Sequence, residues 1–481
     1  MKQGYKKLLK NTGFLAVGSF ASSLLGMLLI PFYTSILSTA DYGVSDLIVT
    51  TTSLLFPFLS VAISESIMRF ALDKDNDKAS IYSAGLYTVG TGFIILVCFS
   101  PVIKLTPLGP YLIYFLLYFL CFCLHTITSY FVKGIEKLKL YSVAGFLNSC
   151  IVILCNILFL LVFKIGIVGY LLSLILGHGI TVIFLFFGAK LYRYITIPWK
   201  LDVSLYRKML MYSIPIIPNS ISWWISNSSD KYVLQYFSDL SEVGIYSVSY
   251  KIPTIVMTVM GLFISAWQIS SVESFGTDES KKFFSNVYKH CFAINIILSS
   301  FLICTSKLFG SFLYAKDFSL AWRYVPVLVL ANTFNVLASF LGSVYTVAKK
   351  TKMLSVSTVI SALSNIVMNF ALIPFIGAMG AAVATLAAYM IMWIIRLINT
   401  RKIMKFPIDH KLSIMLLGLL GVQIVLAEID STVTWVLAAA IFLVLLFVYR
   451  STAASMVKTV LSKFIKPKNK IDICLKEYLN D

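Results

Sequence analysis

Apolar stretches long enough to cross a bilayer follow one another along almost the whole chain. A spanning helix needs about 20 apolar residues at a rise of about 1.5 Å each, and fourteen such segments fit into the 481-residue sequence. We expect helices over residues 12–36, 44–70, 81–103, 110–132, 141–163, 166–189, 207–230, 243–271, 284–306, 323–347, 353–375, 378–400, 411–428 and 432–450. The pattern predicts an all-α, polytopic membrane protein.

Lysine and arginine alternate between the loops on the two sides of the predicted bundle. If Met1 lies in the cytoplasm, about 33 of the 40 basic residues fall on that side and about 6 on the other, with Lys251 inside a span. The positive-inside rule then places both termini in the cytoplasm. Because the charge is spread thinly over loops that face anionic lipid headgroups, the net charge of +19 does not indicate nucleic-acid binding.

Composition agrees with this class of protein. The chain is 59% hydrophobic and 13% charged, with a mean hydropathy of +0.88, which leaves no separate soluble domain. Residues 1–11 and the apolar run after them resemble a signal peptide, but the run is longer than a signal core and thirteen spans follow it, so we expect an uncleaved first helix. Cysteines fall within or at the ends of spans, which indicates neither disulfides nor a zinc site.

The chain also matches itself at a shift of about 200 residues. Ser38–Gly43 lies over Asp239–Gly244, so that an acid and a glycine open the second helix of each half. Further along, Gly166–Gly169 lies over Gly377–Gly380. Chance similarity is the alternative, but the matched residues are loop acids and glycines rather than interchangeable leucines. Each repeat contains six helices, an even number, so both copies enter the membrane in the same orientation and enclose a cavity between them.

This repeat predicts two six-helix bundles in parallel repeat, followed by two extra helices. The expected units are an N-terminal bundle over residues 1–200, a C-terminal bundle over 201–405, two additional spans over 406–450 and a basic cytoplasmic tail over 451–481. Two facing bundles are typical of transporters that expose a central site to either side in turn. Nothing in the chain indicates an enzyme domain.

Polar side chains inside spans outline the expected cavity, because hydrocarbon cannot satisfy them. Asn219, Trp223, Ser226 and Asp230 recur along one face of the seventh helix, and Asn332 belongs to a similar stripe on the tenth. Each stripe has two interpretations. It either faces substrate, or it is a packing seam of the kind that holds membrane helices together.

Charged groups inside spans are fewer. Lys251 lies about 12 Å into the eighth helix by helical rise, beside an expected kink at Pro253, and it either snorkels outward or attracts an anion in the cavity. Arg69 stands four residues after Glu65 near the cytoplasmic end of the second helix, where the two could simply pair with each other. His125 and His178 either relay protons or pack as hydrogen-bonded residues.

Two regions of the chain resemble the bacterial polysaccharide flippases, which translocate O-antigen and capsule repeat units. They are Pro31–Gly43 followed by Ser64–Phe70, and Asn227–Leu234 followed by Glu242–Pro253. The family lies within the multidrug, oligosaccharidyl-lipid and polysaccharide exporter superfamily. The resemblance covers nearly the whole chain, but it does not identify the sugar.

The resemblance implies an oligosaccharide on undecaprenyl diphosphate as substrate, turned over in the bacterial inner membrane by alternating access. On this hypothesis Lys251, supported by Arg69, attracts the diphosphate, while Asn219, Trp223, Ser226 and Asn332 contact sugars. We expect no cofactor and no metal, and coupling to protons or sodium stays open. Membrane lipids are expected partners, and a polysaccharide polymerase and other glycan assembly proteins are candidate partners.

Three alternatives are left open. A drug or metabolite antiporter of the same superfamily would need buried acids for cationic cargo, whereas the deepest charge in this chain is basic. A membrane polysaccharide polymerase would need a large external loop or a catalytic cluster, and neither is evident. A scaffold within a glycan assembly complex would not require a two-bundle repeat.

Overall fold

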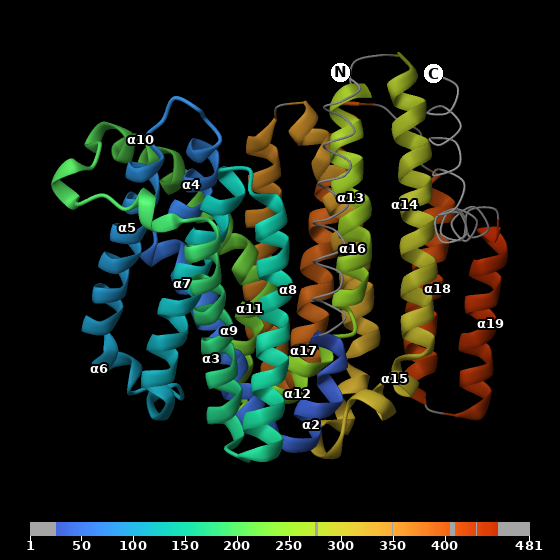
Figure 1. Cartoon of the computed structure of the whole chain (residues 1–481). Helices are drawn as coiled ribbons and strands as arrows, with labels where there is room; N and C mark the ends of the chain where they lie inside the picture. Colours follow the sequence, from blue (N-terminus) through green and yellow to red (C-terminus); the bar gives the residue numbers. More distant parts are fainter. Residues whose placement is uncertain (1–25, 275–277, 349, 405–408, 430, 451–481) are drawn as a thin grey trace, which may run out of the picture.

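The computed structural model describes residues 26–274, 278–348, 350–404, 409–429 and 431–450. These residues form helices joined by short loops, and no strand occurs among them. The long helices run side by side (Figure 1). The predicted all-α polytopic fold is confirmed. Residues 12–25 of the first predicted span and the tail predicted over 451–481 lie outside the described part.

The helices follow the chain in order across the molecule. The first half forms α2 (Ile30–Ile36), α3 (Thr39–Leu59), α4 (Ile63–Ala71), α5 (Lys78–Cys98), α6 (Ser100–Ile103), α7 (Leu112–Gly134), α8 (Leu138–Asn156) and α9 (Gly166–Gly188). The second forms α10 (Val203–Ser213), α11 (Ile217–Phe237), α12 (Leu240–Ser249), α13 (Thr254–Ser274), α14 (Asp278–Cys304), α15 (Ser306–Leu313), α16 (Val325–Val347), α17 (Thr351–Arg401), α18 (His410–Ile429) and α19 (Thr432–Val448). Helices α3–α9 lie on the left of Figure 1 and α13–α19 on the right.

Nine helices of the described residues are long and apolar enough to span a membrane, and a bent pair raises the number to ten. Two shorter apolar helices cover Gly26–Ile36 and Thr432–Val448. Helix α17 contains two predicted spans, which meet at a break at Ile376 and Gly377. The count of fourteen spans stays a prediction.

Two predicted spans are wrong as single helices. The span expected over 44–70 is divided into α3 and α4 at Val61 and Ala62, whose φ angles are +52° and +49°. The span expected over 207–230 is too early, because α10 ends at Ser213 and the long helix is α11. Pro215 lies in the turn between α10 and α11. A proline has no N–H and cannot continue the helical ladder, so a new helix begins after it.

The kink predicted at Pro253 is confirmed. Helices α12 and α13 meet at an angle of 43°. Residues 250–253, which include Lys251, form the turn between them. The bend places a lysine at a break in a helix instead of along its side.

The glycines matched in the two repeats occupy matching places in the fold. Gly166 and Gly377 both have φ of +53°, a backbone that only glycine adopts without strain. Gly43 on α3 and Gly244 on α12 face each other. A Cβ built on Gly43 would collide with the carbonyl oxygen of Leu240, and one built on Gly244 would collide with that of Thr39.

Thr39 and Leu240 are themselves matched positions, so the contacts at this crossing are reciprocal. The helices begin alike as well, because Ser38 and Asp239 each cap the helix by accepting the N–H three residues on, at 3.1 and 2.8 Å. The crossing of α3 and α12 joins the two halves at the lower end of Figure 1.

Buried apolar side chains form two clusters. One is built mainly from α3–α9, and the other mainly from α13–α18. Helix α2 is the exception, because Ile30, Tyr33 and Leu37 pack in the second cluster with residues of α12 and α13. Helices α18 and α19 lie at the edge of the molecule next to α14. The domain bounds at residues 200 and 405 stay predictions.

Candidate functional site

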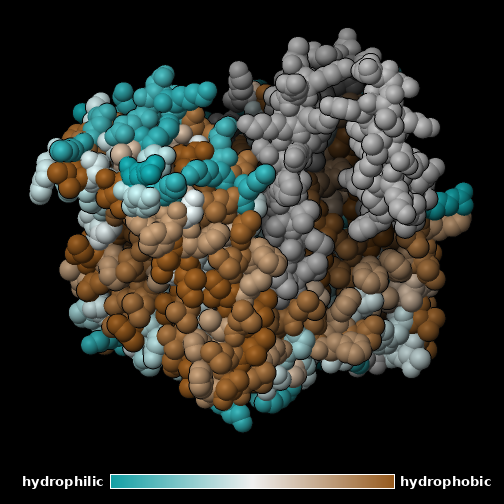
Figure 2. Space-filling model, viewed as in Figure 1, coloured by the Kyte–Doolittle hydropathy of each residue, from teal (hydrophilic) through white to brown (hydrophobic). Residues whose placement is uncertain are grey.

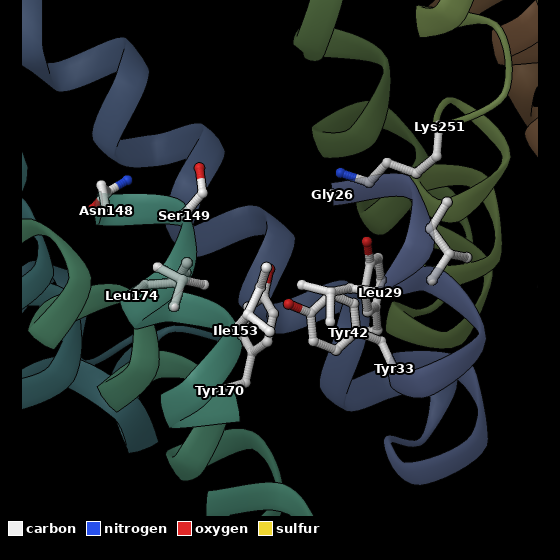
Figure 3. Close-up of a pocket in the computed structure, with 12 residues that line it drawn as sticks. Gly26, Leu29, Tyr33, Tyr42, Asn148, Ser149, Ile153, Tyr170, Leu174 and Lys251 are labelled. Carbon is white, nitrogen blue, oxygen red and sulfur yellow. The ribbon is translucent and has the colours of Figure 1, made fainter. Parts of the chain in front are cut away.

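A cavity of about 240 Å³ lies where α2, α8 and α9 meet the break between α12 and α13 (Figure 3). Its lining consists of Gly26, Leu29, Ile30, Tyr33, Tyr42, Asn148, Ser149, Val152, Ile153, Tyr170, Leu174 and Lys251. All of these except Lys251 come from the first half of the chain. At about 30 Å³ per water molecule, the space suits a phosphate group or one sugar ring, but not a whole oligosaccharide.

Three tyrosines pack together along this cavity. The ring centroids of Tyr33 and Tyr170 are 5.1 Å apart with perpendicular planes, and the Tyr42 ring lies 6.4 Å from each. Asn156 donates a hydrogen bond of 2.9 Å to the Tyr33 hydroxyl. Stacked aromatic rings with polar edges form a firm wall that water can wet.

Lys251 reaches into the same cavity from the second half of the chain. Figure 3 shows its ammonium group directed across the gap towards the wall that carries Asn148 and Ser149. The side chain is half-buried, and no carboxylate of the described residues lies within 4 Å of it. A buried cation costs free energy unless it has a partner, so the cavity favours an anionic ligand.

The structure places the other predicted site residues elsewhere. Of the six, only Lys251 lines this cavity. Arg69 is exposed near the end of α4, and Glu65 accepts a hydrogen bond from Tyr130 at 3.4 Å instead of pairing with it. The remaining four lie on α11 and α16: Asn219 and Trp223 are half-buried, and Ser226 and Asn332 are buried. Their roles stay predictions.

The seventh-helix stripe is used in part for packing. Ser226 donates to the carbonyl of Ser222 at 3.0 Å, and its own carbonyl accepts from the Tyr389 hydroxyl at 3.2 Å. Ser229 donates to Asn365 at 3.1 Å. These bonds join α11 to α17, as expected for a seam of small and amide residues.

One ion pair between the halves was not predicted. The Lys231 ammonium lies 2.6 Å from the Asp46 carboxylate, and the two side chains are only 11% and 15% exposed. Ser247 donates to the same carboxylate oxygen at 2.9 Å. The bridge therefore ties α3 to α11 and α12 beside the glycine crossing. Asp46 and Lys231 are 185 residues apart, and nothing in the sequence pairs them.

A second polar cluster surrounds Asp230, which is 1% exposed. The hydroxyls of Tyr246 and Tyr250 donate to its carboxylate at 2.7 and 3.0 Å, and no lysine or arginine nitrogen of the described residues lies within 4 Å of it. Close by, Asn369 donates to Asn365 at 2.9 Å while its own amide oxygen is buried without a hydrogen-bond partner. An intramembrane acid with unfilled oxygen ligands nearby is a candidate site for a proton or a small cation.

The two histidines left open by the sequence meet in the fold. The Nδ1 atoms of His125 on α7 and His178 on α9 are 3.0 Å apart, so one ring donates a hydrogen bond to the other. Buried Arg396 was not singled out in the sequence. It donates to Ser357, Ala338 and Thr358 at 2.9–3.0 Å and so ties the turns of α16 and α17 together. Neither feature lines the Lys251 cavity.

Within the described ranges, no three histidine, cysteine or acidic side chains are placed to hold a metal ion. The seven cysteines of that part are all free thiols.

Comparison with known proteins bears on this geometry. Three solved structures share the fold: one titled lipid II flippase MurJ in an inward closed conformation (TM-score 0.69, 16% identity, 90% of this chain and 98% of that one); an inward-facing multidrug resistance MATE family transporter of the MOP superfamily (0.66, 12%, 79% and 94%); and a MOP superfamily transporter from Pyrococcus furiosus (0.56, 14%, 82% and 94%). No curated protein matches. Polysaccharide biosynthesis proteins match over residues 8–269, more than half of the 481-residue chain. The chain, an integral membrane protein with a transporter fold, belongs to the polysaccharide biosynthesis protein family.

Proposed function

We propose that this protein is a flippase that moves an oligosaccharide linked to undecaprenyl diphosphate from the cytoplasmic to the outer leaflet, for the synthesis of a surface polysaccharide such as O-antigen or capsule. The observation that carries the proposal is the unpaired ammonium of Lys251 on a cavity formed by both halves. Family membership and the likeness to a lipid II flippase fold support it.

The physical problem is the headgroup. Even one unsatisfied polar group in hydrocarbon costs several kcal/mol, and a diphosphate with sugars presents many. A wet cavity with a cation removes most of that cost, while the prenyl chain stays in lipid. In this proposal Lys251 attracts the diphosphate and Arg69 supports it, while Asn219 and Trp223 contact sugars. Ser226 and Asn332 are buried in this state, so they would reach sugars only after α11 and α16 rearrange.

The proposed location is the bacterial inner membrane with both termini in the cytoplasm. Hydrophilic side chains gather at the upper end of the first half (Figure 2), where Asp73–Lys78 and the segment around α10 lie. The loops counted as basic in the sequence include these, so the upper end is assigned to the cytoplasm. The glycine crossing and the Asp46–Lys231 bridge then close the path to the outside, and alternating access requires both to open.

A drug antiporter is the second candidate, because the fold is also that of a multidrug resistance transporter. The cavity argues against it. Its lining contains one lysine and no acidic residue, which repels the cations that such a protein would carry. A polysaccharide polymerase is the less favoured alternative.

Coupling to an ion is part of the proposal, with Asp230 as the exchanging group. We expect Asp230→Asn to keep its hydrogen bonds from Tyr246 and Tyr250 but to lose the response of transport to an imposed sodium or proton gradient, because an amide cannot exchange a cation. The measurement is transport into proteoliposomes with each gradient in turn. Asp202→Asn, at the exposed start of α10, should keep the response. An unchanged gradient response in Asp230→Asn would remove this residue from coupling.

Complementation distinguishes the two candidate functions. The gene is expressed in a strain that lacks its own repeat-unit flippase, and surface polysaccharide and resistance to a panel of cationic drugs are both measured. The flippase proposal expects restored polysaccharide and unchanged resistance. Drug resistance without polysaccharide would favour the antiporter.

A further inference from the structure

The cavity has a second polar wall opposite Lys251. Asn148 and Ser149 on α8 form it (Figure 3). Ser149 donates to the carbonyl of Gly145 at 3.2 Å within its own helix. Asn148, in contrast, has no hydrogen-bond partner for its amide oxygen, which is buried, and no hydrogen bond of its amide nitrogen occurs among the described residues.

Close helix packing fixes the orientation of this amide. Gly177 on α9 lies against Asn148, and a Cβ built on Gly177 would come within 3.1 Å of the Asn148 oxygen. The oxygen is therefore held between α8 and α9, and the nitrogen faces the cavity (Figure 3). An amide nitrogen carries two N–H donors, so the wall offers neutral donors to a ligand that Lys251 holds by charge.

We propose that Asn148 reads the sugar attached directly to the diphosphate and is a specificity-determining residue. This inference rests on the proposed function. A ligand that satisfies both walls carries an anionic group at one end and a neutral oxygen acceptor at the other. The junction between a diphosphate and its first sugar has this chemistry, with the sugar hydroxyl or acetamido oxygen accepting from Asn148. The volume of about 240 Å³ fits one ring and excludes the rest of the glycan.

The test compares lipids that differ only in that sugar. The purified full-length protein in nanodiscs is titrated with undecaprenyl diphosphate, and with the same lipid carrying a single glucose, galactose, N-acetylglucosamine or N-acetylgalactosamine. We expect at least one sugar-bearing lipid to bind about tenfold more tightly than the bare lipid, as one or two hydrogen bonds provide. Asn148→Leu should remove this preference and leave the affinity for the bare lipid unchanged, which also shows that the variant is folded.

Control variants separate the contributions. Lys251→Met should weaken bare and sugar-bearing lipids by the same factor, whereas Ser142→Ala, on α8 outside the cavity lining, should change neither. Equal binding of all five lipids by the unmodified protein, or an equal loss for bare and sugar-bearing lipids in Asn148→Leu, would overturn the role of Asn148 alone. If no lipid binds the unmodified protein, the proposed function itself fails.

Discussion

Replacing Lys251 by methionine is expected to reduce the translocation of lipid-linked oligosaccharide by about tenfold to a hundredfold. A hydrogen bond to a charged group contributes about 1.5–3 kcal/mol, and each 1.4 kcal/mol corresponds to about tenfold in binding. Methionine retains most of the length and the apolar stem of lysine, so the change removes the charge and little of the packing. The measurement is restoration of surface polysaccharide in a flippase-null strain, at matched amounts of protein in the membrane.

Two matched variants show whether charge is the cause. Lys251→Arg should retain a large part of the activity, because a guanidinium also binds phosphate. Lys307→Met removes a lysine that lies over the rings of Trp322 and Trp435 and not on the cavity, and we expect it to leave transport intact. Full complementation by Lys251→Met would remove this residue from the substrate path.

Adding a side chain at the glycine crossing is expected to drive the two halves apart at their lower end. Any Cβ on Gly43 or Gly244 meets a backbone carbonyl of the opposing helix, and backbone cannot move aside as the tip of a side chain can. Overpacking of this kind typically costs about 1–3 kcal/mol. Gly244→Val should therefore shift the population away from the closed state by about tenfold to a hundredfold.

Pulsed electron paramagnetic resonance measures this shift directly. Spin labels at Lys104 and Ser238, two exposed positions in lower-end loops of the two halves, report the separation in a background without native cysteines. We expect one short distance in the parent and a longer, dominant one in Gly244→Val. Gly90→Ala, where a new Cβ meets nothing within 4 Å, is the control. A Gly244→Val protein that melts normally with an unchanged distance would show that the crossing is not the closure.

Much of the fold follows from sequence because apolar runs and loop glycines act locally. The repeat was visible in the loop glycines, and their structural reason is now clear: Gly166 and Gly377 have positive φ, and Gly43 and Gly244 allow two backbones to touch. The break at Val61 and Ala62 was missed because neither residue type favours positive φ. The shift from 207–230 to α11 arose because Arg207 and Lys208, with the residues around them, form a separate short helix before Pro215.

The candidate site was harder to predict, since depth along a helix can be counted but pairing across helices cannot. Lys251 was found from its depth and from Pro253. The polar stripe of α11 had two interpretations, and Ser226 and Ser229 turn out to bond within or across the seam with α17. Asn148 belongs to no stripe that distinguishes it in the sequence, and its importance depends on which wall of a cavity it occupies.

Translocation by the purified protein tests the central claim most directly, namely that a negatively charged sugar headgroup crosses between the halves past Lys251. The protein is reconstituted into vesicles with undecaprenyl-diphosphate oligosaccharide in both leaflets, and a membrane-impermeant glycosidase then reports the fraction of glycan that becomes accessible with time. We predict rapid and complete accessibility with the unmodified protein and a strongly slowed approach with Lys251→Met. Accessibility that stops at the outer-leaflet fraction, as in protein-free vesicles, would contradict the account.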